Sequence, residues 1–181
     1  MITSYEELLD RLAQEKVEFV LAGGLAVCLN GFVRTTDDVD ILVDNSSENI
    51  ERLTKVLAEF GEGHGATLTA ADLTDEPGAI RIQEDFDLDI FVRMNGKSLS
   101  DLSRWIDYHT LKSGTRIPYL KAAGLIETKV GSSREKDRAD IGALTDIGRE
   151  QEVNRSRAVP ENFNLDSVRD LSSANDTKKP D

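Results

Sequence analysis

The sequence predicts an α+β fold in which a mixed or antiparallel sheet is flanked by helices, with further helices toward the C-terminus. Two short stretches, 39–43 and 86–92, alternate between apolar and polar or acidic residues, which is the two-residue period of a strand. Longer segments near both ends of the chain repeat apolar residues every three or four positions, which is the period of an amphipathic helix. Segments rich in glycine and polar residues separate the two kinds of pattern.

The first third of the chain predicts three helices and two strands. Ser4-x-x-Glu7 resembles a capping box and opens a helix whose apolar positions repeat at helical spacing. An apolar run then ends at Gly23-Gly24, where a second helix begins, and Asn45 to Ser47 supply capping residues for a third helix. In chain order, we expect a helix over 4–15, a strand over 17–22, a helix over 25–30, a strand over 39–43 and a helix closed by Gly61.

The remainder predicts four strands and two helices. Residues 61–78 form a loop with one short element, and 93–103 are polar and rich in turns. Because Pro118 has no N–H to donate, its strand and the neighbouring one are expected at an edge of the sheet. Ser132-x-x-Glu135 opens the last helix, and Gly148 is expected to end it. The predicted elements are antiparallel strands at 80–82 and 86–92, edge strands at 105–111 and 115–120, and helices over 121–130 and 132–147.

The length of 181 residues suits one domain with a C-terminal extension. We place a single domain over 1–148 and an extension over 149–181, whose last residues are expected to be disordered. Phe163 to Leu171 supply enough apolar residues for a small docking helix. No stretch approaches the roughly 20 apolar residues that a membrane-spanning helix needs, so no membrane partner is expected.

Charge and cysteine content narrow the function further. The formal charge of -12 argues against broad affinity for nucleic acid, which draws on many contacts from Lys and Arg to phosphate. The single cysteine, Cys28, lies among aliphatic residues and is expected to be a buried thiol. One cysteine and an acidic N-terminus without the features of a signal peptide predict a cytoplasmic protein.

Two aspartates on one predicted strand indicate a metal site. Asp38 and Asp40 alternate with aliphatic residues, so both carboxylates lie on the same face. At roughly 4–6 Å apart their repulsion is on the order of 3–4 kcal/mol, which a divalent cation would relieve. Asp87 and Asp89 share a face of a neighbouring strand, and one of them supplies a third carboxylate. Asp89 is the preferred residue.

The glycine pair suggests a phosphate site. Gly23 and Gly24 join a strand to a helix, where backbone N–H groups at the positive end of the helix dipole are open to a phosphate. Taken alone, two glycines also fit a simple tight turn. The acidic strand that follows favours the phosphate interpretation.

Together these residues resemble the nucleotidyltransferase superfamily that includes DNA polymerase beta. The resemblance rests on Gly23-Gly24, then Arg34-x-Thr36-x-Asp38-Val39-Asp40, and later Asp89, over residues 17–92. It implies that Asp38, Asp40 and Asp89 bind two Mg²⁺ or Mn²⁺ ions and carry the catalysis. It also implies that the glycine pair cradles nucleotide phosphates, although Gly24 stands where the superfamily often has serine.

The remaining candidates for the nucleotide site follow from the same resemblance. Arg34 contacts phosphate or braces the loop, and Thr36 fixes the turn that aims Asp38. Lys129 lies on a helix face that is otherwise apolar and is expected to reach the triphosphate. Asp137 and Asp140 either hold Lys129 or Lys136 in place or form a solvated helix face, and the sequence leaves both readings open.

A later segment resembles a narrower group within the superfamily. Lys129, Arg134, Lys136-Asp137 and Asp140-Ile141 are similar to a signature of minimal nucleotidyltransferases related to the toxins of type IV abortive-infection toxin–antitoxin systems. This resemblance implies a cognate antitoxin protein as a partner. The two resemblances together cover about residues 17–147.

The resulting hypothesis is an enzyme that transfers a nucleoside monophosphate from a nucleoside triphosphate to a hydroxyl and releases pyrophosphate. The sequence does not specify the acceptor, which is a tRNA or other RNA, a protein or a small molecule. The alternative is a regulatory module with the same fold that binds nucleotide or a partner without turnover. Three carboxylates that repel one another favour the enzyme.

Overall fold

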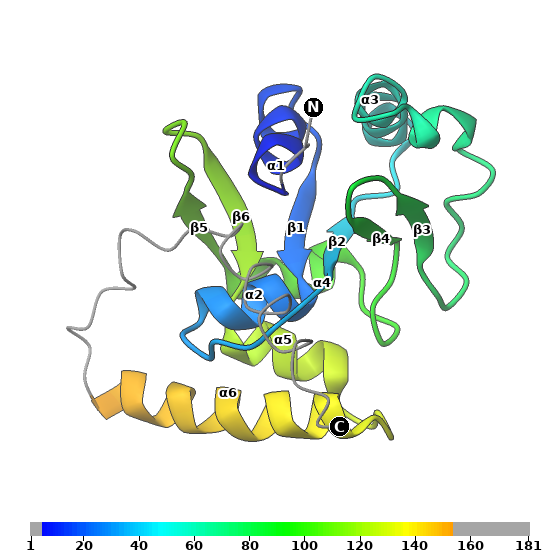
Figure 1. Cartoon of the computed structure of the whole chain (residues 1–181). Helices are drawn as coiled ribbons and strands as arrows, with labels where there is room; N and C mark the ends of the chain where they lie inside the picture. The colour runs from blue at the N-terminus through cyan, green and yellow to red at the C-terminus, as the bar shows by residue number, and fades with distance from the viewer. Residues whose placement is uncertain (1–4, 154–181) are drawn as a thin grey trace, which may run out of the picture.

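A six-stranded mixed sheet forms the centre of the protein in the computed structural model, which describes residues 5–153. The strand order is β3-β4-β2-β1-β6-β5. In Figure 1, α1 and α3 lie at the top of the view, and α2, α5 and α6 lie at the bottom. The strands are β1 (Phe19–Ala22), β2 (Asp38–Val43), β3 (Ile80–Gln83), β4 (Asp87–Phe91), β5 (Ile106–Thr110) and β6 (Arg116–Leu120).

The helices follow the apolar spacing of the sequence. α1 (Tyr5–Gln14) buries Tyr5, Leu8, Leu9 and Leu12, and α3 (Ser47–Ala58) buries a stripe from Ile50 to Leu57. This burial removes one face of each helix from water, which provides most of the stability of such short helices. The other elements are α2 (Gly23–Leu29), α4 (Leu99–Leu102), α5 (Ala122–Lys129), α6 (Glu135–Val153), and the 3-10 turns η1 (His64–Thr67) and η2 (Ser103–Trp105).

Strand pairing places the acidic residues side by side. β2 runs antiparallel to β1 and parallel to β4, while β3 pairs antiparallel with β4. In the β2–β4 ladder, Asp40 lies level with Asp89 and Asp38 level with Asp87. In the β3–β4 ladder, Arg81 lies opposite Asp89. The predicted α+β fold, with a mixed sheet flanked by helices, is confirmed.

The position predicted for one strand is wrong. β5 is an edge strand, but β6 lies between β5 and β1, although it contains Pro118. The pairing of β6 with β1 is confined to Leu21 and Tyr119, next to Pro118. A parallel contact this short does not require the backbone donor that proline lacks.

The end predicted for the last helix is also wrong. α6 continues through Gly148 to Val153. A Cβ atom at Gly148 would meet no neighbour within 4 Å, and an interior glycine costs a helix only about 1 kcal/mol relative to alanine. The domain boundary at 148 stays a prediction, and the small helix expected at 163–171 lies outside the described residues.

Two further features concern the expectations from sequence. The polar segment 93–103 contains α4, which opens with a capping box between Ser98 and Asp101 that the sequence analysis did not identify. Cys28 is buried, as predicted. Within residues 5–153, no helix combines the length and apolar character needed to cross a bilayer.

Candidate functional site

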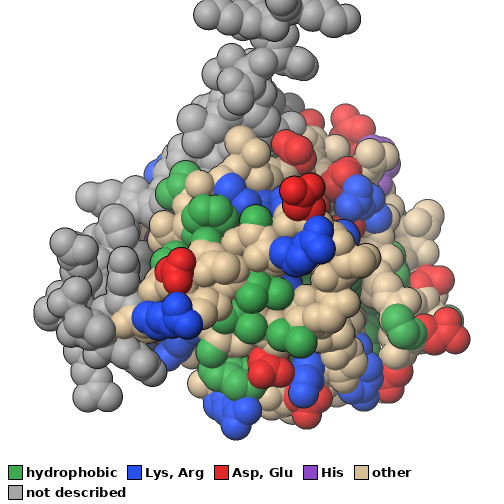
Figure 2. All heavy atoms as spheres, turned by 90° about the horizontal axis from the view of Figure 1, so that it is seen from below, with side chains coloured by type: hydrophobic (Ala, Val, Ile, Leu, Met, Phe, Trp, Pro, Cys, Tyr) green, Lys and Arg blue, Asp and Glu red, His purple; other side chains and the backbone are tan. Residues whose placement is uncertain are grey.

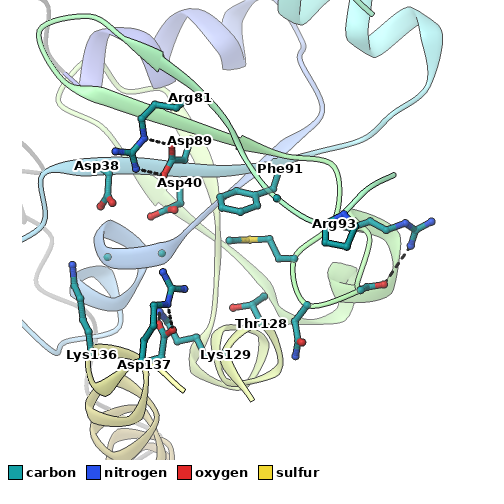
Figure 3. Close-up of a pocket in the computed structure, with 18 of the residues that line it drawn as sticks. Asp38, Asp40, Arg81, Asp89, Phe91, Arg93, Thr128, Lys129, Lys136 and Asp137 are labelled. Carbon is teal, nitrogen blue, oxygen red and sulfur yellow. Dashed lines mark hydrogen bonds and ion pairs between the residues drawn. The ribbon is translucent and has the colours of Figure 1, made fainter. Parts of the chain in front are cut away.

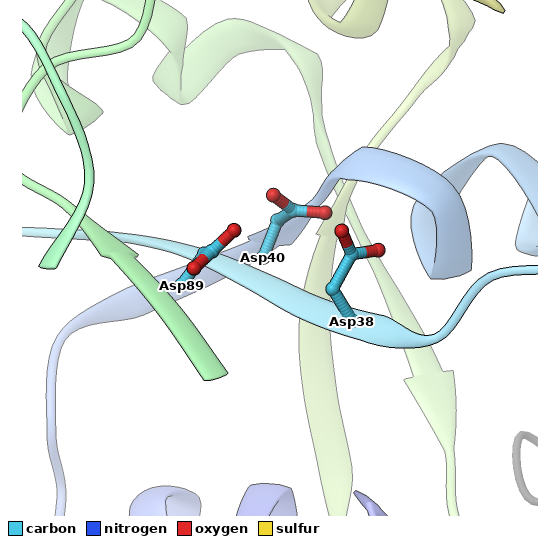
Figure 4. Close-up of side chains that lie close together, drawn as sticks. All are labelled: Asp38, Asp40 and Asp89. Atoms are coloured by element: carbon cyan, nitrogen blue, oxygen red, sulfur yellow. The ribbon is translucent and has the colours of Figure 1, made fainter. Parts of the chain in front are cut away.

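Three carboxylates meet on one face of the sheet. Asp38 and Asp40 extend from β2 and Asp89 from β4, and one oxygen from each lies within 4.8 Å of the others. Figure 4 shows the three side chains turned toward a common point. Asp87 belongs to the same face of β4 but is not part of this group. The geometry therefore matches the preference for Asp89 over Asp87.

Thr36 orients the first carboxylate. Its hydroxyl donates a hydrogen bond of 2.6 Å to Oδ1 of Asp38, and the side chain is buried. Because this hydroxyl donates to one oxygen of Asp38, it fixes the carboxylate's direction at the start of β2. Thr36 does not line the cavity described below, and a direct contact between Thr36 and nucleotide stays a prediction.

The glycine pair allows a close approach between α2 and β2. A Cβ atom at Gly23 would lie 1.7 Å from Oδ2 of Asp40, and one at Gly24 would lie 2.3 Å from the hydroxyl of Thr36. Gly23 also has a φ of +55°, which residues with a side chain rarely adopt. The pair is therefore required by the packing around Asp40 and Thr36, in addition to any contact with phosphate.

The second carboxylate is electrostatically strained. Burial, followed by the charges of Asp38 and Asp89, raises the pKa of Asp40 to about 7, although Lys129 and a backbone hydrogen bond from Gly24 act in the opposite direction. A carboxyl with such a pKa is partly protonated at neutral pH unless a cation replaces the proton. The like charges around Asp40 are what a divalent ion would neutralise.

Arg81 is a functional candidate that the sequence analysis did not identify. Its Nε and Nη2 donate to the two oxygens of Asp89 at 2.8 and 2.6 Å, and Nη1 donates to Asp87 at 2.8 Å. These contacts raise the pKa of the guanidinium further above its usual value. The signal was present, because Arg81 alternates with Ile80 and Ile82 in a strand predicted to pair with the one that carries Asp89.

A network of ion pairs joins α6 to this site. Asp140 is fully buried, and it accepts hydrogen bonds at 2.8 and 3.0 Å from Arg34. Lys129 lies 2.8 Å from Asp137 and 3.0 Å from Asp140. Of the two readings left open by the sequence, the contact with Lys129 is the observed one. Arg34 braces the loop before β2 by pairing with α6.

Asp137 is the second anchor of this network. It accepts hydrogen bonds from Lys129, from the hydroxyl of Ser132 at 2.6 Å and from Arg134 at 2.7 Å. Burial alone would raise the pKa of Asp137, but these hydrogen bonds and the nearby positive charges hold it at about 2. Asp137 therefore stays ionised and keeps Lys129 in place across the neutral range.

A cavity of about 490 Å³ connects these groups. It is within the size range of small-molecule sites. Figure 3 shows Lys136, Asp137 and Lys129 on one side, the three carboxylates opposite, and Phe91 farther along the cavity. Seven of the eight nominated site residues line the cavity: Gly23, Gly24, Arg34, Asp38, Asp40, Asp89 and Lys129.

The donor set fits a divalent metal ion. Mg²⁺ and Mn²⁺ prefer carboxylate oxygens, and this site offers three carboxylates on rigid strands. Arg81 donates hydrogen bonds to both oxygens of Asp89, but each carboxylate oxygen can accept more than one hydrogen bond or metal contact. Asp89 can thus serve Arg81 and an ion together.

Comparison with known proteins identifies the fold. No family model and no curated protein matches the chain. Among solved structures, the lincosamide antibiotic adenylyltransferase LnuA, with lincomycin bound, is 20% identical with a TM-score of 0.52, over 81% of this chain and 98% of that chain. A Thermotoga maritima protein assigned as a nucleotidyltransferase is 17% identical with a TM-score of 0.43, over 82% and 87%. On the similarity to the first of these structures, the chain has the nucleotidyltransferase fold.

Proposed function

We propose that the protein is a metal-dependent nucleotidyltransferase, which moves a nucleoside monophosphate from a nucleoside triphosphate to a hydroxyl and releases pyrophosphate. One observation carries this proposal: Asp38, Asp40 and Asp89 converge within 4.8 Å beside the glycine pair. The fold that carries these residues is similar to that of the lincosamide adenylyltransferase LnuA. A binding module without turnover would gain nothing from holding three repelling carboxylates together.

The residues divide into two functional groups. Asp38 and Asp40 would hold Mg²⁺ or Mn²⁺, and Asp89 would complete the site and assist removal of the acceptor proton, directly or through water. When bound, two such ions stabilise the attacking and leaving oxygens of an in-line displacement. Gly23 and Gly24 would contact the phosphates.

The cations across the cavity form the second group. Arg34 and Lys129 line the cavity together with Arg134 and Lys136, so they are placed to attract a triphosphate. Among the side chains of residues 5–149, no carboxylate forms an ion pair with Lys136, and Figure 3 shows its side chain extended from α6 toward the strand that carries Asp38. Lys136 is therefore a further candidate for a phosphate contact.

Several finer points remain predictions from sequence. Membership of the toxin group and a cognate antitoxin partner rest on the resemblance alone, and the cytoplasmic location rests on the single cysteine and the acidic N-terminus. The comparison with LnuA adds one consideration, because the acceptor named for that protein is an antibiotic, which is a small molecule. A small-molecule hydroxyl is therefore included among the acceptors to be tested.

The test is transfer of label from each of four radiolabelled nucleoside triphosphates with Mg²⁺, with a cell extract as the source of acceptors. We expect Asp38→Asn to reduce transfer by at least about a thousandfold, equivalent to about 4 kcal/mol of transition-state stabilisation. Asp37→Asn is the matched control, because its exposed side chain lies outside the carboxylate group and should retain full activity.

Undiminished transfer by Asp38→Asn would contradict the proposal. Calorimetry with Mg²⁺ and ATP, paired with a pyrophosphate-release assay, distinguishes the enzyme from the regulatory module. Nucleotide binding by the wild-type protein with no pyrophosphate release under any condition would favour the regulatory module.

A further inference from the structure

The two ends of the cavity differ in chemistry. One end carries the glycine pair and four cationic residues, Arg34, Lys129, Arg134 and Lys136. The other end is lined by the half-buried side chains of Phe91 and Met94. The nearby guanidinium of Arg93 donates to Asp75 at 3.1 Å and to the carbonyl of Gly96, and Figure 3 shows it directed away from Phe91. This end therefore offers an apolar patch, formed by Phe91 and Met94, beside the polar side chains of Thr128 and Asn95, which line the same cavity.

Phe91 lies on the same strand face as the third carboxylate. Asp87, Asp89 and Phe91 occupy alternate positions of β4, and alternate residues of a strand point to the same side. An aromatic ring thus follows Asp89 directly along the edge of the site. Its partly exposed surface is available to a ligand.

The chemistry of the proposed function assigns a substrate to this end. In an in-line displacement, the attacking oxygen approaches the α-phosphorus from the side opposite to the leaving pyrophosphate. Pyrophosphate is expected at the cationic end, so the acceptor hydroxyl arrives from the side of Asp89 and Phe91. Resting on the proposed function, we propose that Phe91 and Met94 form the acceptor subsite for a small molecule whose hydroxyl is carried beside an apolar ring.

Anchored loops limit the size of this acceptor. The turn at Asn95 and Gly96 lines the cavity, and the side-chain amide of Asn95 donates to the carbonyls of Glu127 and Val130 at 2.9 and 3.0 Å. Arg93 ties the same turn to the loop at Asp75. Both walls are thereby fixed beside a cavity that the triphosphate also occupies, which favours a small molecule over a macromolecule.

Charge disfavours a polyanionic acceptor. The chain has a formal charge of -12, and affinity for a nucleic acid backbone depends on clustered cations. On the described part of the face seen in Figure 2, blue and red side chains are interspersed and form no continuous basic stripe. An uncharged ring-bearing alcohol meets no such electrostatic penalty.

The transfer balances as a single displacement. A bond forms between the acceptor oxygen and the α-phosphorus, and the bond from that phosphorus to the bridging oxygen of pyrophosphate breaks. The acceptor proton passes to Asp89 or to water, and pyrophosphate leaves with the electron pair of the broken bond. No oxidant or reductant is required.

The methionine content permits a direct test. Met94 is one of only two methionines, the other being Met1, so ¹³C-methyl labelling yields a resonance for Met94 that Met94→Leu identifies. The probes are benzyl alcohol, glycerol, Mg²⁺ with tripolyphosphate, and Mg²⁺ with α,β-methylene-ATP. We expect benzyl alcohol to move the Met94 resonance through its ring current, both alone and with the ATP analogue bound. Glycerol and tripolyphosphate should leave the resonance in place.

Two variants show where benzyl alcohol binds, and a pyrophosphate-release assay shows whether that binding supports the reaction. Phe91→Ala should weaken the benzyl alcohol titration by about tenfold, whereas Tyr108→Ala, which removes an exposed aromatic side chain outside the cavity, should not change it. With Mg²⁺ and ATP, benzyl alcohol should stimulate pyrophosphate release more than glycerol does. Phe91→Ala should lose that stimulation.

Three results would overturn the inference. In the first, the ATP analogue shifts Met94 through its base and blocks benzyl alcohol, so that the subsite holds the nucleobase. In the second, benzyl alcohol produces no shift, or an equal one in Phe91→Ala. In the third, it binds but stimulates no release. Failure of the proposed function is separate, because it would appear as no label transfer to any acceptor in the cell extract, whereas the third result overturns the inference in a protein that does transfer label.

Discussion

The two charged regions that face each other across the cavity differ in how their charges are balanced. On α6, Asp137 and Asp140 are each paired with Lys129 and with an arginine at hydrogen-bonding distance. On the sheet, Asp38, Asp40 and Asp89 face one another. Among the side chains of residues 5–149, the cation that forms an ion pair with this group is Arg81, which contacts Asp89. In the first region the acidic and basic side chains neutralise one another and stabilise the fold. In the second region the three carboxylates need a bound cation to become neutral.

The largest expected effect is obtained by breaking the balanced region. Asp140→Asn keeps the shape of the side chain but leaves the largely buried cations of Arg34 and Lys129 without their shared counter-charge. We expect a loss of about 3 kcal/mol in the free energy of unfolding, measured by urea denaturation. The matched control is Asp146→Asn on the same helix, whose ion pair with Arg149 is exposed and worth little. Equal stability of both variants would contradict the buried role of Asp140.

The second prediction concerns Asp40 on the sheet and the pH dependence of the free energy of unfolding. The folded-state pKa of Asp40 is raised from 3.8 to about 7, so between about pH 4 and 7 the folded protein binds a proton that the unfolded chain has released. The free energy of unfolding should therefore fall as pH rises through this window, with a total on the order of 2–4 kcal/mol. Asp137, with a pKa of about 2, titrates below it.

Urea denaturation in EDTA at pH 5.5 and pH 8 measures this dependence. Asp40→Asn removes the titrating group, so its unfolding free energy should change much less between the two pH values. Saturating Mg²⁺ should also flatten the profile of the wild-type protein, because the ion takes the place of the proton. If the unfolding free energy changed equally with pH in the wild-type protein and in Asp40→Asn, the electrostatic argument for a metal would be contradicted.

The smallest effect concerns Arg81, whose side chain is half exposed. Arg81→Gln removes the positive charge from beside Asp89, and we expect the melting temperature without metal to fall by roughly 2 °C. The loss should shrink in saturating Mg²⁺, since the ion then supplies the positive charge. Arg149→Gln, at an exposed pair, is the control that shows no dependence on metal. A loss for Arg81→Gln that is the same with and without Mg²⁺ would assign Arg81 a purely structural role.

Much of the fold followed from local patterns. The strands that carry Asp38, Asp40 and Asp89 were predictable from their alternation, and the first helix from its capping box and apolar spacing. These features depend on residues close together in the chain. The interior position of β6 was not predictable, because Pro118 indicates an edge and only the tertiary pairing with β1 overrides that preference.

The site was predictable to a similar degree. The three carboxylates and the glycine pair were found from the sequence, since their spacing is local or resembles a known pattern. Arg81 was not identified, although the predicted pairing of its strand with that of Asp89 carried the signal, and Phe91 was not, because its relevance depends on the shape of the cavity. The structural reason for Gly23 was also hidden, since it is the close approach of Asp40 that excludes a side chain there.

The parallel pairing of β2 with β4 has a consequence for how the protein folds. Asp40 and Asp89 are distant in sequence, because α3, a long loop and β3 separate their strands in the chain. Contacts between distant segments form slowly, because the intervening chain must first lose its freedom. The three acids consequently come together only when the central strands pair. A newly synthesised chain therefore brings the three proposed metal ligands together at the step that completes the middle of its sheet.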